Sequence, residues 1–296
     1  MILLTIILAL GLSHYRAPMT SLQNDRWFFT WLAKVSGWTL LAKIPAGRLL
    51  LSLALPVVGL WLLLDILADI PVLLLLAIEL WVLLYSFGRG DLPVELNTLQ
   101  SDLRRGDRQA AFHVGEQLSA DKSKMVAFDL PALAQELRQR VAYAHFERYL
   151  AVIFWCLVGG VTAALLYRLS VLYRSALVQS LDRSVEGESS FSEYLQLRTA
   201  SAWLCLLEWL PLGFNGLVLS LVGQFGAGLS RLTSRWCSGR GSAQVLQDFV
   251  DDALAYPRDS EARSKADIAA SCEQIAGLFQ RVLVCWLCLL ALGLIL

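Results

Sequence analysis

One uncharged stretch constrains the fold of this chain more than any other feature. Residues 150–167 read LAVIFWCLVGGVTAALLY, without a single charged side chain. As a helix that rises about 1.5 Å per residue, the stretch would be roughly 27 Å long, close to the hydrocarbon thickness of a bilayer. It is therefore predicted to be a membrane-spanning helix. Gly159 and Gly160 near its middle leave room for close packing against another helix, which is compatible with self-association into a homo-oligomer.

The composition agrees with a membrane protein. Of the 296 residues, 56% are hydrophobic and only 17% are charged, whereas a soluble domain carries about 25% charged residues. The 25 basic residues balance the 25 acidic ones, so the chain lacks the excess positive charge with which proteins bind nucleic acids. We expect an all-α, polytopic membrane protein with four to six spans and a helical cytoplasmic region. Its first partner is the lipid bilayer, and it binds no nucleic acid.

Five further apolar segments are candidate spans, and they cover residues 1–12, 47–64, 71–87, 203–222 and 275–296. The first is short. Because no basic residue precedes it and no small-residue cleavage site follows it, we expect it to stay in the protein rather than to be removed as a signal peptide. In residues 13–46, basic side chains alternate with tryptophan and phenylalanine, as in helices at the level of the lipid headgroups. An interfacial helix is predicted there, with a plain packed connector as the alternative.

Residues 88–149 form the largest polar region. Leucines recur at helical spacing from Leu92 onward, Gly106 ends that helix, and Asp107 and Asp129 are placed to cap the next two. The region carries nine basic residues, which places it in the cytoplasm. The predicted domains are an N-terminal membrane segment with an interfacial helix and a helical hairpin (1–87), a cytoplasmic helical region (88–149), and a C-terminal membrane region (150–296) that contains the central span and a cytoplasmic loop (223–277).

The chain lacks the short motifs of several enzyme classes. It has no phosphate-binding loop, no GxSxG nucleophile elbow and no HExxH zinc motif. None of its three histidines, His14, His113 and His145, has a second ligand at metal-binding spacing. The six cysteines lie mostly in apolar runs, where we interpret them as packing residues. No catalytic residue, metal site or cofactor is therefore predicted.

Two acidic residues lie inside predicted spans, namely Glu79 and Glu208. An ionised carboxylate in hydrocarbon costs about 2.5 kcal/mol or more, so each acid must be neutral, paired or facing a polar cavity. Candidate partners lie near the ends of predicted spans, and they are Arg168, Arg174 and Arg281. Two interpretations remain open. The acids either line a functional polar pocket within the helix bundle, or form buried ion pairs that only fix how the helices pack.

Two more polar residues, His145 and Glu147, precede the uncharged stretch at its cytoplasmic end. They are either ligand contacts or solvated groups on a helix surface. The predicted ligand-binding set is therefore His145, Glu147, Arg168, Arg174 and Glu208, and the intramembrane polar residues are Glu79 and Glu208.

Three pieces of the chain resemble the AmpE family of bacterial inner-membrane proteins. The longest is residues 143–174, YAHFERYLAVIFWCLVGGVTAALLYRLSVLYR, in which an aromatic apolar run precedes a glycine pair and an aromatic-basic end. EWLP at 208–211 and LVG at 221–223 are similar to further pieces of the family, as is Gly106-Asp107 before an alanine-rich helix. The resemblance implies a multi-pass inner-membrane protein with a signalling role in β-lactamase induction and peptidoglycan recycling. It also implies proteins of the AmpD pathway as partners.

AmpE proteins are in turn similar to CobD and CbiB, cobalamin-biosynthesis membrane enzymes that join cobyric acid to an aminopropanol unit. Where those enzymes carry polar and acidic runs, this chain has Tyr143-Ala144, Val171–Arg174 and Leu204-Cys205, and only Glu147 keeps an acid. We therefore expect a non-enzymatic regulatory protein that binds a small ligand or a protein partner at its cytoplasmic face. The alternative is a CobD/CbiB-like, ATP-dependent amide-forming enzyme with a degenerate site, which would use Mg-ATP. A transporter is disfavoured because no internal repeat is evident.

Overall fold

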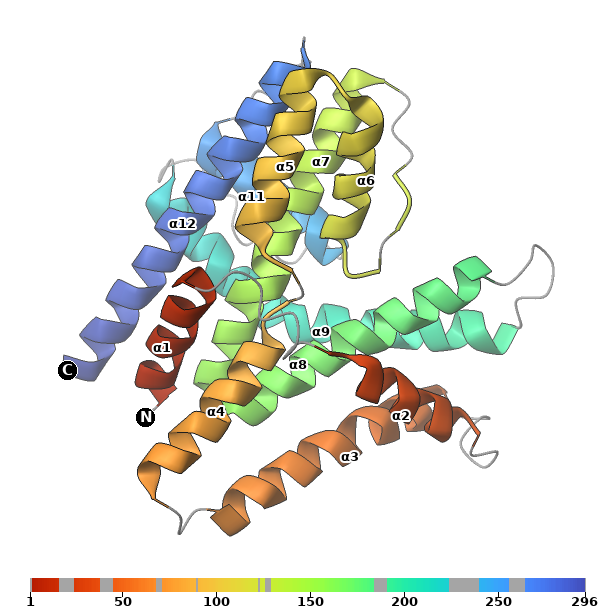
Figure 1. Cartoon of the computed structure of the whole chain (residues 1–296), viewed down its shortest axis with the longest axis vertical. Coiled ribbons are helices and arrows are strands. Elements are labelled where there is room, and N and C mark those ends of the chain that lie inside the picture. The colour runs from red at the N-terminus through yellow and green to blue at the C-terminus, as the bar shows by residue number, and fades with distance from the viewer. Residues whose placement is uncertain are drawn as a thin grey trace. The chain divides into compact units, whose positions relative to one another are not determined.

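A computed structural model describes residues 2–15, 24–37, 45–67, 71–88, 90–121, 123–125, 129–183, 191–223, 240–255 and 264–295. Every regular element in these ranges is a helix, which confirms the all-α prediction (Figure 1). The elements are α1 (Ile2–Tyr15), α2 (Arg26–Ser36), α3 (Pro45–Ile66), α4 (Val72–Ser86), α5 (Leu92–Arg105), α6 (Arg108–Leu118), α7 (Leu130–His145), a π-helical turn η2 (Phe146–Leu150), α8 (Ala151–Arg183), α9 (Phe191–Val222), α11 (Ser242–Leu254) and α12 (Lys265–Ile295).

Four helices of the described chain are long and apolar enough to cross a membrane. They are Pro45–Ile66, the run of consecutive helical segments Leu130–Arg183, Phe191–Val222 and Lys265–Leu292. Ile2–Ser13 and Val72–Ser86 are apolar but shorter. The protein is therefore a polytopic helical membrane protein, as expected. The last two long helices begin well before the predicted spans at 203 and 275, because polar turns extend each apolar segment.

The chain divides into two compact units. Unit 1 contains Met1–Gly90 and Ala151–Leu207, and unit 2 contains Asp91–Leu150 and Glu208–Leu296. Each unit is therefore built from two separate stretches of the chain. The three-part division proposed from charge and hydropathy stays a prediction.

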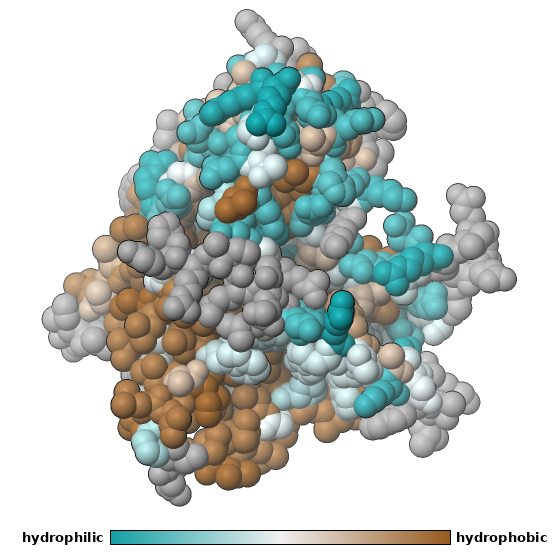
Figure 2. Space-filling view, viewed as in Figure 1, coloured by the Kyte–Doolittle hydropathy of each residue, from teal (hydrophilic) through white to brown (hydrophobic). Residues whose placement is uncertain are grey.

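In unit 1, α3 and α4 both pack against α8, α1 packs against α4, and α2 lies against α3 and α8 (Figure 1). The outer faces of α3 and α4 carry large exposed apolar side chains such as Trp61, Leu62 and Leu73. Figure 2 shows this apolar surface in brown over the end of α3 and the start of α4. A surface of this kind is unfavourable in water and is solvated by lipid tails, which agrees with a membrane location.

The central uncharged stretch is not one straight helix. α8 is broken at Gly159, with φ −136° and ψ 20°, and at Gly160, with φ 69° and ψ −169°. The predicted span over 150–167 lies within the candidate span Leu130–Arg183, but the sequence did not predict the break at its middle. The physical reason is that Gly160 occupies a backbone region that is open to glycine and strained for other residues. Beyond the break the helix continues to Arg183.

In unit 2, the predicted helix ends of the polar region are confirmed. Gly106 stops α5 in the left-handed conformation, with φ 82°. The carboxylates of Asp107 and Asp129 accept hydrogen bonds from the first turns of α6 and α7, at 3.0 and 2.9 Å. Leu92, Leu96, Leu99 and Leu103 are all buried, as their spacing indicated. Figure 2 shows the outward faces of α5 and α6 as hydrophilic.

Two further helices of unit 2, α11 and α12, pack against α7. α12 also packs against α5. α11 is amphipathic, and its buried side includes Val245, Leu246, Phe249 and Val250. The chain approaches α11 closely at Gly223, where a Cβ atom would lie 2.6 Å from the backbone of Ala253.

We expect Gly160→Ala to lower the free energy of unfolding by roughly 1–3 kcal/mol, because an L-residue is strained at this φ and ψ. Reversible unfolding in mixed micelles measures the change. Gly59→Ala is the matched control, since Gly59 lies inside α3 and a Cβ atom there meets nothing within 4 Å; that variant should be neutral or slightly stabilised. A Gly160→Ala variant as stable as the wild-type protein would contradict the break in α8.

Candidate functional site

The candidate site in unit 2 is organised by the π-helical turn η2, between α7 and α8. A π-helix places one extra residue in a turn and is found mostly as single turns, often at functional sites. The extra residue shifts the side chains around the helix axis, so that the consecutive residues Glu147 and Arg148 are both buried, at 8% and 6% exposed. The interpretation of Glu147 as a solvated surface group is therefore wrong.

Arg148 connects η2 to the hairpin of α5 and α6. Its Nη1 donates to Oε2 of Glu95, on α5, at 2.8 Å, and its Nη2 donates to the carbonyl oxygen of Leu118 at 3.1 Å. Leu118 is the last residue of α6, so its carbonyl has no partner within that helix. Hydrogen bonds from a guanidinium to such acceptors are among the stronger ones in proteins. One buried side chain thus holds three helical elements together.

The buried acid Glu208 has a tyrosine partner. The hydroxyl of Tyr143, on α7, donates to Oε1 of Glu208, on α9, at 2.7 Å. Glu208 is only 2% exposed. This buried acid thus has a tyrosine among its partners, where only basic partners were predicted.

His145 lies at the end of α7, one residue before η2. Its Nδ1 is 2.9 Å from the carbonyl oxygen of Val141, and its ring stacks on Phe279 of α12, with 4.9 Å between ring centroids and 12° between planes. The imidazole is half-buried. His145 therefore helps to fix α12 against α7 rather than pointing freely into solvent.

A second buried polar contact in unit 2 was not predicted. Nε1 of Trp286, on α12, donates to Oδ1 of Asn215 at 3.1 Å, and Nδ2 of Asn215 donates to the carbonyl oxygen of Pro211 at 2.8 Å. Asn215 is fully buried. A polar residue within an apolar helix is a signal of the same kind as Glu208, so an inspection of amides as well as acids would have found it.

The other predicted site residues lie in unit 1. Arg168 of α8 forms a buried ion pair with Asp25, with 3.5 Å between Nη2 and Oδ2. Thr5 of α1 donates a hydrogen bond to Oε2 of Glu79 at 3.3 Å. The structure thus gives Arg168 and Glu79 partners other than those expected. Arg174 lies half-buried further along α8.

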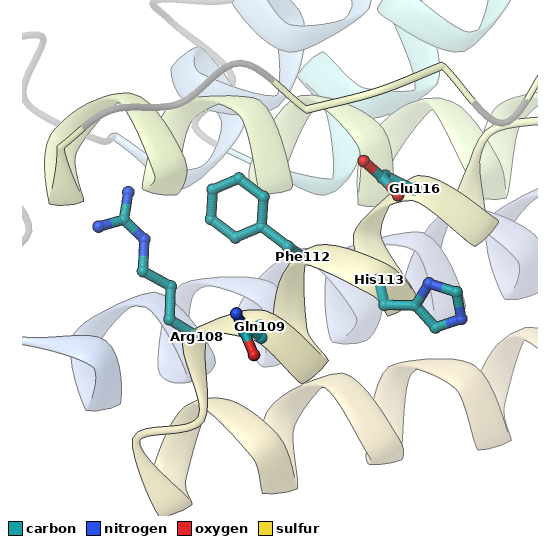
Figure 3. Close-up of a pocket in the computed structure, with 5 residues that line it drawn as sticks. All are labelled: Arg108, Gln109, Phe112, His113 and Glu116. Atoms are coloured by element: carbon teal, nitrogen blue, oxygen red, sulfur yellow. The ribbon is translucent and has the colours of Figure 1, made fainter.

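The surface of unit 2 has a shallow hollow along α6 (Figure 3). We call it the α6 hollow; its volume is about 400 Å³, and the described residues that line it are Arg108, Gln109, Phe112, His113 and Glu116. The guanidinium of Arg108 lies over the ring of Phe112, 5.2 Å from its centroid, which is a cation–π contact. Figure 3 shows all five side chains projecting from this one helix. The hollow therefore offers a partner both charge and an aromatic ring.

The described residues contain no group of three or more side chains arranged to hold a metal ion. The five cysteines within the described ranges are free thiols. The polar side chains of the candidate site make hydrogen bonds, ion pairs and ring contacts, which hold helices in register.

Comparison with known proteins adds one finding. The family model described as "Regulatory signalling modulator protein AmpE" matches residues 1–292. No curated protein and no solved structure matches the chain. The more distant similarity to CobD and CbiB is not shown by these comparisons.

We expect Tyr143→Phe and Glu208→Gln to be coupled. Each should lower the free energy of unfolding, and the double variant should lose less than the sum by about 0.5 kcal/mol or more, because Tyr143→Phe removes the buried hydrogen bond that Glu208→Gln weakens by taking away the charge of its acceptor. Pairing Glu208→Gln with Tyr194→Phe is the control, since Tyr194 is an exposed residue of α9 and those two effects should add. Additive effects for Tyr143 and Glu208 would contradict the contact.

A second prediction concerns Asp251 of α11. Burial raises the pKa of its carboxyl group, while Arg138 and a hydrogen bond from Gln247 act in the opposite direction. The folded protein then holds this proton to a higher pH than the unfolded chain does, so stability falls as the pH rises through the window that begins near 3.8, the ordinary pKa of an aspartate side chain. Asp251→Asn should remove this fall. Unfolding measured against pH checks it, and identical slopes in both proteins would refute it.

Proposed function

The chain belongs to the AmpE family of regulatory signalling modulators, and from this membership we propose that it regulates β-lactamase induction or peptidoglycan recycling from the bacterial inner membrane. Its long apolar helices support the membrane location. The regulatory role comes from the family, and the geometry of unit 2 suggests how a signal is received. We propose that a protein partner binds the α5–α6 hairpin and that Arg148 transmits its presence to the π-helical turn.

The observation that carries this proposal is the pair of hydrogen bonds made by Arg148. They run to Glu95 on α5 and to the end of α6 at Leu118. Any movement of the hairpin that lengthens them removes partners from a buried guanidinium, which is costly. The position of the hairpin and the state of η2 are therefore coupled.

A π-helical turn can serve as one state of a two-state element. If η2 changes to α-helix, one residue leaves the turn and the side chains beyond it rotate by about 100° around the helix axis. The helix that contains η2 runs without interruption from Leu130 into α8. A partner that favours one state over the other shifts the population between them, which is the thermodynamic basis of a signal.

The α6 hollow is the partner surface that we propose. It is open and shallow and lies on the same helix as Leu118, whose carbonyl Arg148 holds. Its lining combines Arg108, Phe112 and Glu116, and arginine and aromatic side chains are enriched in protein interfaces. We propose a protein of the AmpD pathway as the partner.

Replacing the chromosomal gene with variants in a bacterium that carries an inducible β-lactamase tests the proposal. Arg148→Gln should change the ratio of induced to basal β-lactamase activity several-fold, in the direction of a gene deletion, at normal protein level in the membrane. Arg105→Gln is the matched control, because Arg105 is an exposed cation at the end of α5, and it should leave the ratio unchanged.

Two results would contradict the proposal. If deleting the gene does not change the ratio of induced to basal β-lactamase activity, the protein does not have the proposed regulatory role. If the deletion changes the ratio but Arg148→Gln does not, Arg148 does not transmit the signal. In the purified protein, stabilisation by magnesium-ATP in a thermal unfolding scan would instead favour an ATP-using enzyme, because a ligand of the folded state raises stability by mass action.

A further inference from the structure

Unit 1 has a groove between α2 and α3 that the proposed regulatory function does not use. We call it the α2–α3 groove; it has a volume of about 560 Å³ and is lined by Trp27, Thr30, Trp31, Lys34, Leu55 and Pro56. We propose that it binds one anionic phospholipid of the surrounding bilayer, with the phosphate at Lys34 and an acyl chain along Leu55 and Pro56.

The walls of the groove fit an acyl chain. Trp27 of α2 and Leu55 of α3 are large apolar side chains, 45% and 46% exposed. α3 is itself one of the four helices suited to cross a membrane. In a bilayer these side chains are solvated by lipid tails, so a chain in the groove replaces no bound water and meets apolar atoms on both sides.

The floor of the groove is fixed by a hydrogen bond that compensates for a proline. Pro56 has no N–H group, so it cannot donate to the carbonyl oxygen of Ser52 four residues earlier in α3. Nε1 of Trp31 donates to that oxygen instead, at 3.1 Å. The bond attaches α2 to α3 at the proline. It also holds the Trp31 ring in place.

The second tryptophan of the groove is also anchored. Nε1 of Trp27 donates to the hydroxyl oxygen of Tyr85, on α4, at 3.0 Å. Both indoles are therefore held before any lipid binds. A preformed site loses less side-chain entropy on binding than a flexible one, which favours a specific, long-lived lipid over the general contact of a protein with its bilayer.

The charge of the groove selects the headgroup. Lys34, in the last turn of α2, is exposed. α2 contains no acidic residue, and the described lining of the groove contains none either. A lysine beside tryptophans at the membrane surface is suited to a phosphate, for which its ammonium group supplies charge and donors.

The contacts of Trp31 bring the cation and the apolar wall of the groove together. Lys34 lies three residues after Trp31 in α2, and Trp31 is bonded to Ser52, one turn before Pro56 in α3. Lys34, Leu55 and Pro56 therefore line one groove. A lipid can place its phosphate at Lys34 and an acyl chain against Leu55 and Pro56.

Native mass spectrometry of the detergent-purified full chain, titrated with phosphatidylglycerol, tests the proposal. The first lipid should bind with a dissociation constant that Lys34→Gln raises about fivefold, as expected for the loss of one cation near an anionic headgroup. Leu55→Trp, which fills the groove, should also weaken binding. Arg26→Gln is the matched control, because Arg26 is an exposed cation of the same helix outside the groove, and it should leave binding unchanged.

Each alternative outcome would overturn the proposal. Equal losses in Lys34→Gln and Arg26→Gln would show a diffuse charge effect, and equal affinity for phosphatidylcholine would show that the groove does not select an anionic headgroup. Competition by inorganic phosphate alone or strong preference for a polyisoprenyl phosphate would assign the groove to another ligand. Unchanged thermal unfolding midpoints and circular dichroism show that the variants are folded, so a loss of binding then reports on the groove itself.

Discussion

The rest of this structure depends on the need of every backbone N–H and C=O group in hydrocarbon to find a hydrogen-bond partner within the protein. Helices meet this need by themselves, which is why the described part of an apolar chain consists of long helices. The informative positions are those where the helical pattern is interrupted. Trp31 supplies the donor that Pro56 lacks, Gly160 allows a change of backbone direction in α8, and Arg148 holds a helix end beside the π-helical turn.

Much of the fold was predictable because it depends on local sequence. The leucine spacing of α5, the stop at Gly106 and the caps at Asp107 and Asp129 each involve residues within one or two turns of one another. The apolar segments likewise predicted helices and a membrane location. The break at Gly159 and Gly160 was missed because small residues within a span favour close helix packing and backbone breaks alike, and the neighbouring helices decide between them.

The candidate site was predictable only in part, because its contacts join residues far apart in the sequence. The sequence marked Glu208 and Arg168 as polar residues in apolar surroundings, and both are buried with polar partners. It did not identify Tyr143 or Asp25 as those partners, since hydrophobic periodicity does not say which helix faces meet. Arg148 was counted only as a charge that sets topology, although it makes the contacts on which the proposed signalling depends.

Amide hydrogen exchange of residues 146–150, in protein reconstituted into vesicles, tests the central claim most directly, namely that Arg148 couples the α5–α6 hairpin to the π-helical turn. Local opening of a helix is seen as faster exchange of its amides. The account predicts that Arg148→Gln speeds exchange in 146–150 while α12 stays as protected as in the wild-type protein. Unchanged exchange in 146–150 would contradict it, because the turn would then be held by contacts other than those of Arg148.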